Sequence, residues 1–262
     1  MSWDGRQRAM LAEMGYRLPP AAVEAAEAVQ EDRDRPREDV AVAPPPPAAR
    51  PAAPAPAPVR GPVPGPAAPP SDLAALDLAA LREAVLAGQA CGGACEHRIH
   101  LFGRGALPRA DWLVVADAPA EADEGAGELL AGDAGRLLER MLRAAGQRLD
   151  GEGATAFLAP LVPGRAPRGR PPQPAEAEAG EAVLARLAEL LQPRLLLAIG
   201  PLAARRLTGL ADPLGRLRGR VHSWRGLPVV ATYAPAYLLR SPADKAGAWD
   251  DLCLARRTVA AP

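Results

Sequence analysis

The residues best suited to bind an anion follow the last apolar run of the sequence. In the stretch TYAPAYLLRSPADK, Pro235, Arg240, Ser241 and Lys245 come after the apolar residues 227–231. The end of a strand and the start of a helix present backbone N–H groups and a positive dipole end, and Arg240 and Lys245 add formal charge. Such a turn suits the phosphates of a nucleic acid. The alternative is that Arg240 only pairs with a neighbouring carboxylate and Pro235 only ends the strand.

A second basic group precedes this turn and consists of Arg205, Arg206, Arg216, Arg218, Arg220 and Arg225. Residues 201–262 carry ten Lys and Arg against four Asp and Glu, whereas residues 111–153 carry four against ten. A basic surface of this kind supplies the long-range attraction that nucleic-acid binding needs. Because Lys245 is the only lysine, a solvated arginine-rich face without function is the alternative.

Four soft or borderline metal ligands lie close together in GQACGGACEHRIH, namely Cys91, Cys95, His97 and His100. A zinc ion could use such a set, although the spacing matches no strong zinc pattern. The third cysteine, Cys253, falls in a helical pattern and is expected to be an ordinary buried thiol.

The elements that must position these residues alternate along the chain. Short apolar runs at 112–116, 155–159, 194–200 and 227–233 are separated by helical patterns at 134–145, 175–191, 201–207 and about 243–257. This alternation predicts an α/β fold, a three-layer α/β/α domain with a central parallel four-stranded sheet. Ligands of such sheets bind at the carboxyl ends of the strands, where ADAPA, AIGPLA and TYAPAYLLR fall.

The N-terminal part of the chain has a different composition. Residues 1–35 predict a short helical segment, and residues 36–71, with the sequence VAVAPPPPAARPAAPAPAPVRGPVPGPAAPP from position 40, predict a disordered Pro/Ala-rich linker. A helical pattern begins after Ser71, a candidate N-cap, so we expect the folded domain to span 72–259.

The chain has no stretch of about 20 apolar residues and no signal-peptide pattern at its start. With few cysteines as well, we expect a cytoplasmic protein without membrane contact. We also expect a monomer.

The motifs ADAPA, GDAGRLLERML, RLLLAIGPLAARRL, TYAPAYLLRSPADK and AWDDLCLARR occur in the order in which similar motifs occur in bacterial family 4 uracil-DNA glycosylases, which contain an iron-sulfur cluster. The chain resembles this family over about residues 73–257. The resemblance implies the glycosylase fold and implies that AIGPLA and LLRSPADK face DNA. On that basis, we expect Gly200, Arg218, Arg220, Pro235, Arg240, Ser241 and Lys245 to contact DNA.

The resemblance also locates the base pocket, at Ala116, Asp117, Ala118, Pro119, Leu130, Pro160 and Ala234. Leu130 stands where the family has a phenylalanine that stacks on the base, Pro160 where it has an asparagine that reads the base, and Ala234 where it has a histidine near the leaving base. Leucine lacks an aromatic face, and proline and alanine have no side-chain hydrogen-bonding groups. Asp117, which stands where the family has a glutamate, keeps a carboxylate that could orient a water; the alternative is an exposed loop aspartate.

The cluster ligands of the family are incomplete here. A [4Fe-4S] centre needs four cysteines, whereas Cys91 and Cys95 have three intervening residues instead of two and the later positions align with Gly164 and Gly180. We therefore expect no cofactor, with Cys91 and Cys95 as remnants.

Three functions are consistent with this pattern. The first is a catalytically degenerate glycosylase that acts as a DNA-binding or interaction module: it binds DNA weakly, with single-stranded DNA as one option, or contacts a protein partner through its N-terminal helix or Pro-rich arm. The second is an active DNA glycosylase of altered specificity. The third is a protein-interaction scaffold that does not bind DNA.

Overall fold

The computed structural model describes residues 73–91, 99–165 and 169–260, with the side chain of Cys91 excepted. The predicted helical segment 1–35, the linker 36–71, and the residues Cys95 and His97 lie outside the described part of the chain. No helix within these ranges is long and apolar enough to cross a membrane.

A six-stranded sheet with the order β1-β3-β2-β4-β6-β5 forms the centre of the domain. Its inner strands run parallel to one another, as the four apolar runs predicted; they are β2 (Trp112–Ala116), β3 (Ala156–Pro160), β4 (Leu195–Ile199) and β6 (Leu227–Thr232). Every residue of β2, β3 and β4 is buried. Strands that are apolar throughout can be buried on both faces, so the α/β prediction is confirmed.

Two short strands extend the sheet beyond the four that the sequence predicted. The outer strands β1 (Arg104–Gly105) and β5 (Val221–Trp224) pair antiparallel with β3 and β6. Strand β1 has only two residues, and β5 combines the exposed Val221 and Ser223 with the half-buried His222 and the buried Trp224. Neither forms an apolar run, because an edge strand needs to bury little of its surface.

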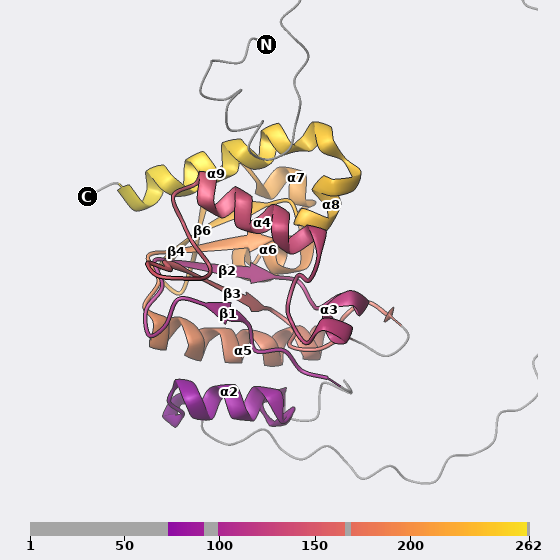
Figure 1. Ribbon diagram of the computed structural model, residues 1–262, viewed down its shortest axis with the longest axis vertical. Helices are drawn as coiled ribbons and strands as arrows, with labels where there is room; N and C mark the ends of the chain where they lie inside the picture. Colours follow the sequence, from indigo (N-terminus) through magenta and orange to yellow (C-terminus); the bar gives the residue numbers. More distant parts are fainter. Residues whose placement is uncertain (1–72, 92–98, 166–168, 261–262) are drawn as a thin grey trace, which may run out of the picture. The chain divides into compact units, whose positions relative to one another are not determined.

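Helices cover both faces of the sheet (Figure 1). One face carries α4 (Asp133–Ala144) and α9 (Lys245–Ala260), and the other carries α5 (Pro174–Leu191) and α6 (Pro201–Thr208). Neighbouring strand residues alternate between the two cores: Val114 packs on the α4 and α9 side and Val115 on the α5 and α6 side. This alternation is the two-residue period of a strand.

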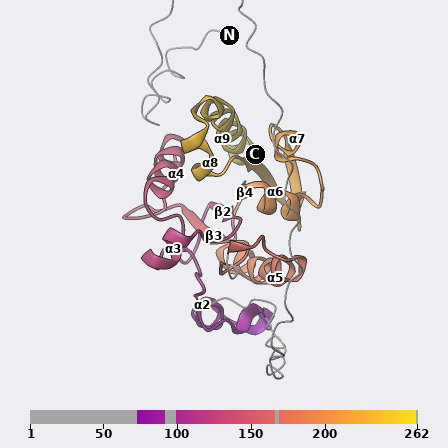
Figure 2. The same cartoon turned by 90° about the vertical axis from the view of Figure 1, so that its right-hand side faces the viewer.

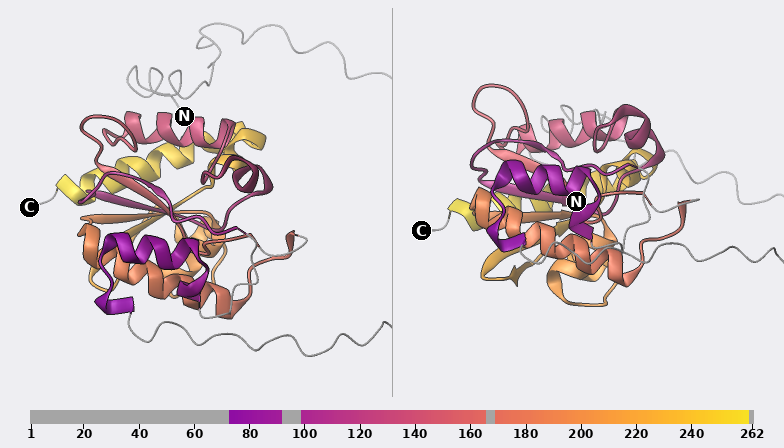
Figure 3. Two further views of the ribbon diagram at one scale, coloured as in Figure 1. Left: turned by 60° about the horizontal axis from the view of Figure 1, so that its bottom comes forward. Right: turned by 90° about the horizontal axis from the view of Figure 1, so that it is seen from below.

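The first described helix starts later than the sequence predicted. Instead of one helix from Leu73, the chain forms a single 3-10 turn, η1 (Leu73–Ala75), and then α2 (Leu78–Leu86). The side chain of Asp77 accepts a hydrogen bond from the amide of Ala80 at 2.8 Å and so caps α2. Helix α2 packs beside α5 (Figure 3).

Short helices follow the carboxyl ends of the strands. Helix α3 (Glu121–Ala126) follows β2 and α8 (Pro235–Arg240) follows β6, both on the side to which the strands point (Figure 2). The connection after β2 leads to β3 on one side, whereas the connection after β4 leads to β6 on the other. The edge between β2 and β4 is therefore the point at which the winding reverses, where sheets of this type bind ligands.

Candidate functional site

The predicted pocket positions Ala116 and Pro160 lie side by side at the carboxyl edge of the sheet. Ala116 is in register with Pro160 of β3 and with Ile199 of β4, and Ile199 is in register with Thr232 of β6. Asp117 and Gly200 follow the neighbouring strands β2 and β4 directly. Positions far apart in the sequence are thus brought to one edge.

The carboxylate of Asp117 is bound to the start of α6. Its Oδ1 accepts a hydrogen bond from the amide of Ala203 at 2.7 Å, and the amide of Leu202 also contributes. Burial raises the pKa of Asp117 above its ordinary value; these amides and the charge of Arg205 oppose the rise. Asp117 is half-buried, which excludes the alternative of an exposed loop aspartate.

Gly200 makes this contact between strands geometrically feasible. It is buried, has φ +124°, and a Cβ built on it would lie 2.6 Å from both carboxylate oxygens of Asp117. Gly200 is the N-cap of α6 and has no side chain to bond the free amides. Asp117 supplies that acceptor from the next strand, so amides of the segment AIGPLA, which the family resemblance implied to face DNA, are bonded within the protein.

Asp123 fixes the loop that carries Leu130. It is only 2 % exposed, and its carboxylate accepts hydrogen bonds from the amides of Ala120 at 2.9 Å and Ala131 at 2.7 Å. Leu130 has φ +55° and packs partly buried against the core on the α4 side. A left-handed leucine costs roughly 1–2 kcal/mol, so the buried Asp123 holds this loop in a conformation that leucine itself disfavours.

The other pocket positions contribute shape without polar side chains. Pro119 and Pro160 are buried and Ala118 is half-buried, while Ala234 is the half-buried N-cap of α8. Apart from Asp117, the predicted pocket residues therefore have no side-chain donor or acceptor.

The predicted DNA-contact residues around α8 differ in their accessibility. Pro235 is the first residue of α8 and is buried, and Ser241 ends the helix with its amide bonded to the carbonyl of Tyr237 at 2.9 Å. Arg240 is exposed. Lys245 is 8 % exposed at the start of α9, which leaves Arg240 as the accessible cation of this turn.

Arg218 is held inside the protein by an acid that sequence reasoning missed. Its Nε lies 2.7 Å from Oδ2 of Asp251 in α9, where the two side chains are 14 % and 1 % exposed. Burial raises the pKa of Asp251, and the charge of Arg218 opposes the rise. Arg220, by contrast, is exposed and its Nε donates to the carbonyl of Arg216 at 3.0 Å.

Two tyrosines that were not predicted as site residues, Tyr233 and Tyr237, stack on each other, and Tyr233 lies next to Arg218. The guanidinium carbon of Arg218 lies 3.8 Å from the ring centroid of Tyr233, whose ring stacks on Tyr237 with centroids 5.0 Å apart and planes at 29°. The hydroxyl of Tyr237 donates to Asp244 at 2.6 Å. Their spacing of four residues at a strand-to-helix junction was the one signal in the sequence.

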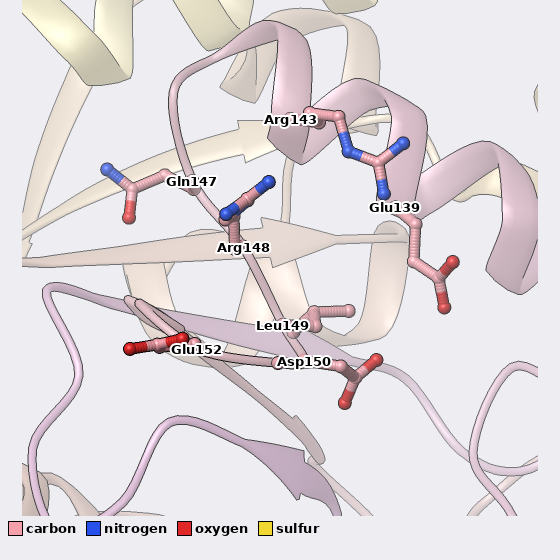
Figure 4. Close-up of a pocket in the computed structure, with 8 residues that line it drawn as sticks. Glu139, Arg143, Gln147, Arg148, Leu149, Asp150 and Glu152 are labelled. Atoms are coloured by element: carbon pink, nitrogen blue, oxygen red, sulfur yellow. The ribbon is translucent and has the colours of Figure 1, made fainter.

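A cavity of about 370 Å³ lies at the C-terminal end of α4, beside the loop that leads to β3 (Figure 4). Figure 4 shows Glu139 and Arg143 on α4 and Arg148 and Asp150 on the following turn. Both Glu139 and Asp150 form ion pairs with Arg104 of β1. The cavity contains none of the predicted site residues.

The positions aligned with cluster ligands can be judged only in part. Gly164 is buried and pairs with His100 in an isolated bridge, and a Cβ built on Gly180 would lie 1.7 Å from the carbonyl oxygen of Leu161. Neither glycine has a thiolate, and a side chain at Gly180 would clash with backbone. Within residues 73–90, 99–165 and 169–260, no group of three His, Cys, Asp or Glu is placed to bind a metal ion.

Comparison with known proteins identifies the relatives of this chain. The family model of the uracil DNA glycosylase superfamily matches residues 102–253. Type-4 uracil-DNA glycosylase of Pyrobaculum aerophilum is 30 % identical over 60 % of this chain and 84 % of its own length. The corresponding proteins of Archaeoglobus fulgidus and Thermotoga maritima are 30 % and 31 % identical, each over 51 % of this chain and over 69 % and 68 % of their own lengths.

These relatives contradict the prediction that the chain has no cofactor. They are type-4 enzymes, the iron-sulfur family that the sequence motifs resemble, so the family carries a cluster. The described residues do not fit such a group, because Gly164 and Gly180 cannot ligate iron.

Proposed function

Because the chain belongs to the uracil-DNA glycosylase superfamily, we propose that it binds DNA at the carboxyl edge of its sheet and has lost the uracil-excision chemistry of its relatives. The coarse function, a protein of the uracil-DNA glycosylase family, follows from membership. The loss of chemistry and the DNA contact are the proposal.

The observation that carries the proposal is that the carboxylate of Asp117 is already hydrogen-bonded to the protein's own backbone. This carboxylate is the one hydrogen-bonding side chain among the pocket positions, and its Oδ1 accepts from the amide of Ala203 at 2.7 Å. A glycosylase must stack, read and release a flipped base. Without a donor at Ala234, the departing base loses help that is typically worth about 3–4 kcal/mol.

DNA binding is supported by the charge of the same edge. Arg240 is exposed at the end of α8, and Arg216 and Arg220 are exposed just before β5, whose first residue, Val221, is in register with Val230 near the carboxyl end of β6. The exposed Arg225 lies in the turn between β5 and β6, at the other end of these strands. Phosphate attraction needs such accessible cations and no base-reading group. Single-stranded DNA is the expected ligand, since apart from Asp117 the pocket positions have no polar side chain that could bind a base flipped out of a duplex.

The test is a titration of labelled single-stranded DNA with the full chain at several salt concentrations. We expect the affinity to fall steeply as the salt concentration increases. When the protein binds, it releases salt cations that were condensed on the phosphates, and added salt opposes this release. Undetectable binding at low salt would reject DNA binding and favour a protein-interaction scaffold.

One observation favours the second candidate, an active glycosylase of altered specificity. Burial raises the pKa of Asp117 at the edge where family chemistry takes place, and a raised carboxyl pKa in a cleft is a feature of general bases. Base release from uracil- or hypoxanthine-containing DNA that disappears in Asp117→Asn would establish this candidate instead.

A further inference from the structure

Three planar groups form a column beside the carboxyl edge of the sheet. Arg218 lies on one face of Tyr233, at 3.8 Å from the ring centroid, and Tyr237 stacks on Tyr233 at 5.0 Å. We refer to Arg218, Tyr233 and Tyr237 as the aromatic column. Its inner end is buried, since Arg218 is 14 % exposed, whereas Tyr237 at its outer end is 36 % exposed.

Both ends of the column are fixed by carboxylates. Asp251 binds Arg218 at 2.7 Å and is itself 1 % exposed. Asp244 accepts the hydroxyl hydrogen of Tyr237 at 2.6 Å, which restrains the outer ring. Gly247 of α9 leaves room for the guanidinium, because a Cβ there would lie 2.7 Å from a terminal nitrogen of Arg218. The ring of Tyr237 is therefore presented in one orientation.

The exposed part of Tyr237 is suited to a flat, aromatic ligand. Tyr233 covers one face of its ring, so the accessible area belongs to the other face and the edges. A preorganised aromatic face next to a cation is the arrangement that binds unpaired bases, with stacking on the ring and phosphate on the cation. The exposed Arg240, three residues further along and the last residue of α8, supplies that cation.

We infer that Tyr237 is a stacking site for an unpaired base of single-stranded DNA, with the phosphate backbone held by Arg240. This inference rests on the proposed DNA binding and adds to it a contact with a base. In this inference, the aromatic ring that stacks on a base belongs to Tyr237 in α8, and not to the pocket position that Leu130 occupies. Stacking of this kind tolerates any base, because every base has a π-face.

The experiment compares two oligonucleotides of equal length and charge with the full chain: oligo-dT and a chain of abasic tetrahydrofuran units. Wild type should bind oligo-dT about 5- to 150-fold more tightly, the range expected for one stacked base. Tyr237→Ala should lose most of this preference and keep its affinity for the abasic chain. Arg240→Ala should weaken both complexes equally.

Two further variants keep the test independent of folding. Tyr237→Phe retains the ring without the bond to Asp244, and its preference for oligo-dT over the abasic chain should stay within about 3-fold of wild type. Tyr237→Leu keeps an apolar side chain over Tyr233 but should lose the preference for oligo-dT, because leucine has no aromatic face. If wild type binds neither oligonucleotide, both the proposed DNA binding and this inference fail. If wild type binds both equally, or if Tyr237→Leu retains the preference, DNA binding stands and the stacking site is overturned.

Discussion

Oδ1 of Asp117, at the end of β2, lies 2.7 Å from the amide nitrogen of Ala203, in the first turn of α6. The bond spans the edge between β2 and β4, where the winding of the sheet reverses. Sheets of this type normally bind ligands in this crevice. Here the carboxylate of Asp117 accepts hydrogen bonds from the amides that a ligand anion would otherwise bind. The same contact therefore affects both the stability of the fold and the binding of a ligand.

The raised pKa of Asp117 predicts a specific dependence of stability on pH. Because the pKa is higher in the folded than in the unfolded state, the folded state binds more protons between the two values, and the free energy of unfolding falls as pH rises through that window. Asp117→Asn does not titrate there. The stability of wild type relative to Asp117→Asn should therefore increase as pH falls towards the ordinary aspartate value, 3.8. Urea unfolding of both proteins across this pH range measures the difference, and an opposite trend would contradict a raised pKa of Asp117.

Gly200→Ala should destabilise the protein through the same contact. The new Cβ would lie 2.6 Å from both oxygens of Asp117, at φ +124°, and strain together with overpacking predicts a loss of about 2–4 kcal/mol. Gly209→Ala is the matched control, because Gly209, at the other end of α6, also has a positive φ but has open space around it. That variant should lose about 1 kcal/mol. Equal losses in chemical denaturation would show that Asp117 does not fill the space over Gly200.

The parallel part of the sheet could be predicted from the sequence because its strands are short runs of apolar residues. The run 112–116 coincides with β2, and the other three runs differ from their strands by one residue at an end or at both. The outer strands could not be predicted, since β1 has two residues and Val221 of β5 is exposed. The start of α2 was misplaced because Asp77, in the middle of a helical pattern, is an N-cap.

The site was predictable as a set of positions and not as a set of contacts. Strand register explains why Ala116 and Pro160 are neighbours, since both are the last residues of adjacent parallel strands. The partner of Asp117 is 86 residues away and the partner of Arg218 is 33 residues away. No local pattern encodes such pairings. Arg218 therefore looked like a surface cation in the sequence although its charge is buried against Asp251.

Asp251→Ala should be one of the most destabilising substitutions of a buried residue in α9. It would leave the charge of Arg218 without its partner at 2.7 Å, and breaking a buried ion pair typically costs about 3–5 kcal/mol. Arg216→Ala is the control, because Arg216 is 76 % exposed and lies 3.6 Å from Asp212. Its loss should stay within about 0.5 kcal/mol. Thermal and urea unfolding of both variants provide the comparison, and a mild effect of Asp251→Ala would contradict a buried pair.

Arg240→Ala should reduce the salt dependence of DNA binding. Removing one phosphate contact lowers the slope of log affinity against log salt concentration by about 0.7 for a single strand. Arg148→Ala removes an exposed arginine from the cavity at the opposite end of α4 and should leave the slope unchanged. Equal slopes for wild type and Arg240→Ala would place the DNA contact elsewhere.

The central claim, that family chemistry has been lost, is tested most directly by single-turnover excision from a uracil-containing single-stranded oligonucleotide with excess protein. The account predicts no release of uracil above the rate without protein, and the same result for wild type and Asp117→Asn. Release by wild type that is abolished in Asp117→Asn would contradict it, because the carboxylate bonded to Ala203 would then be an active group.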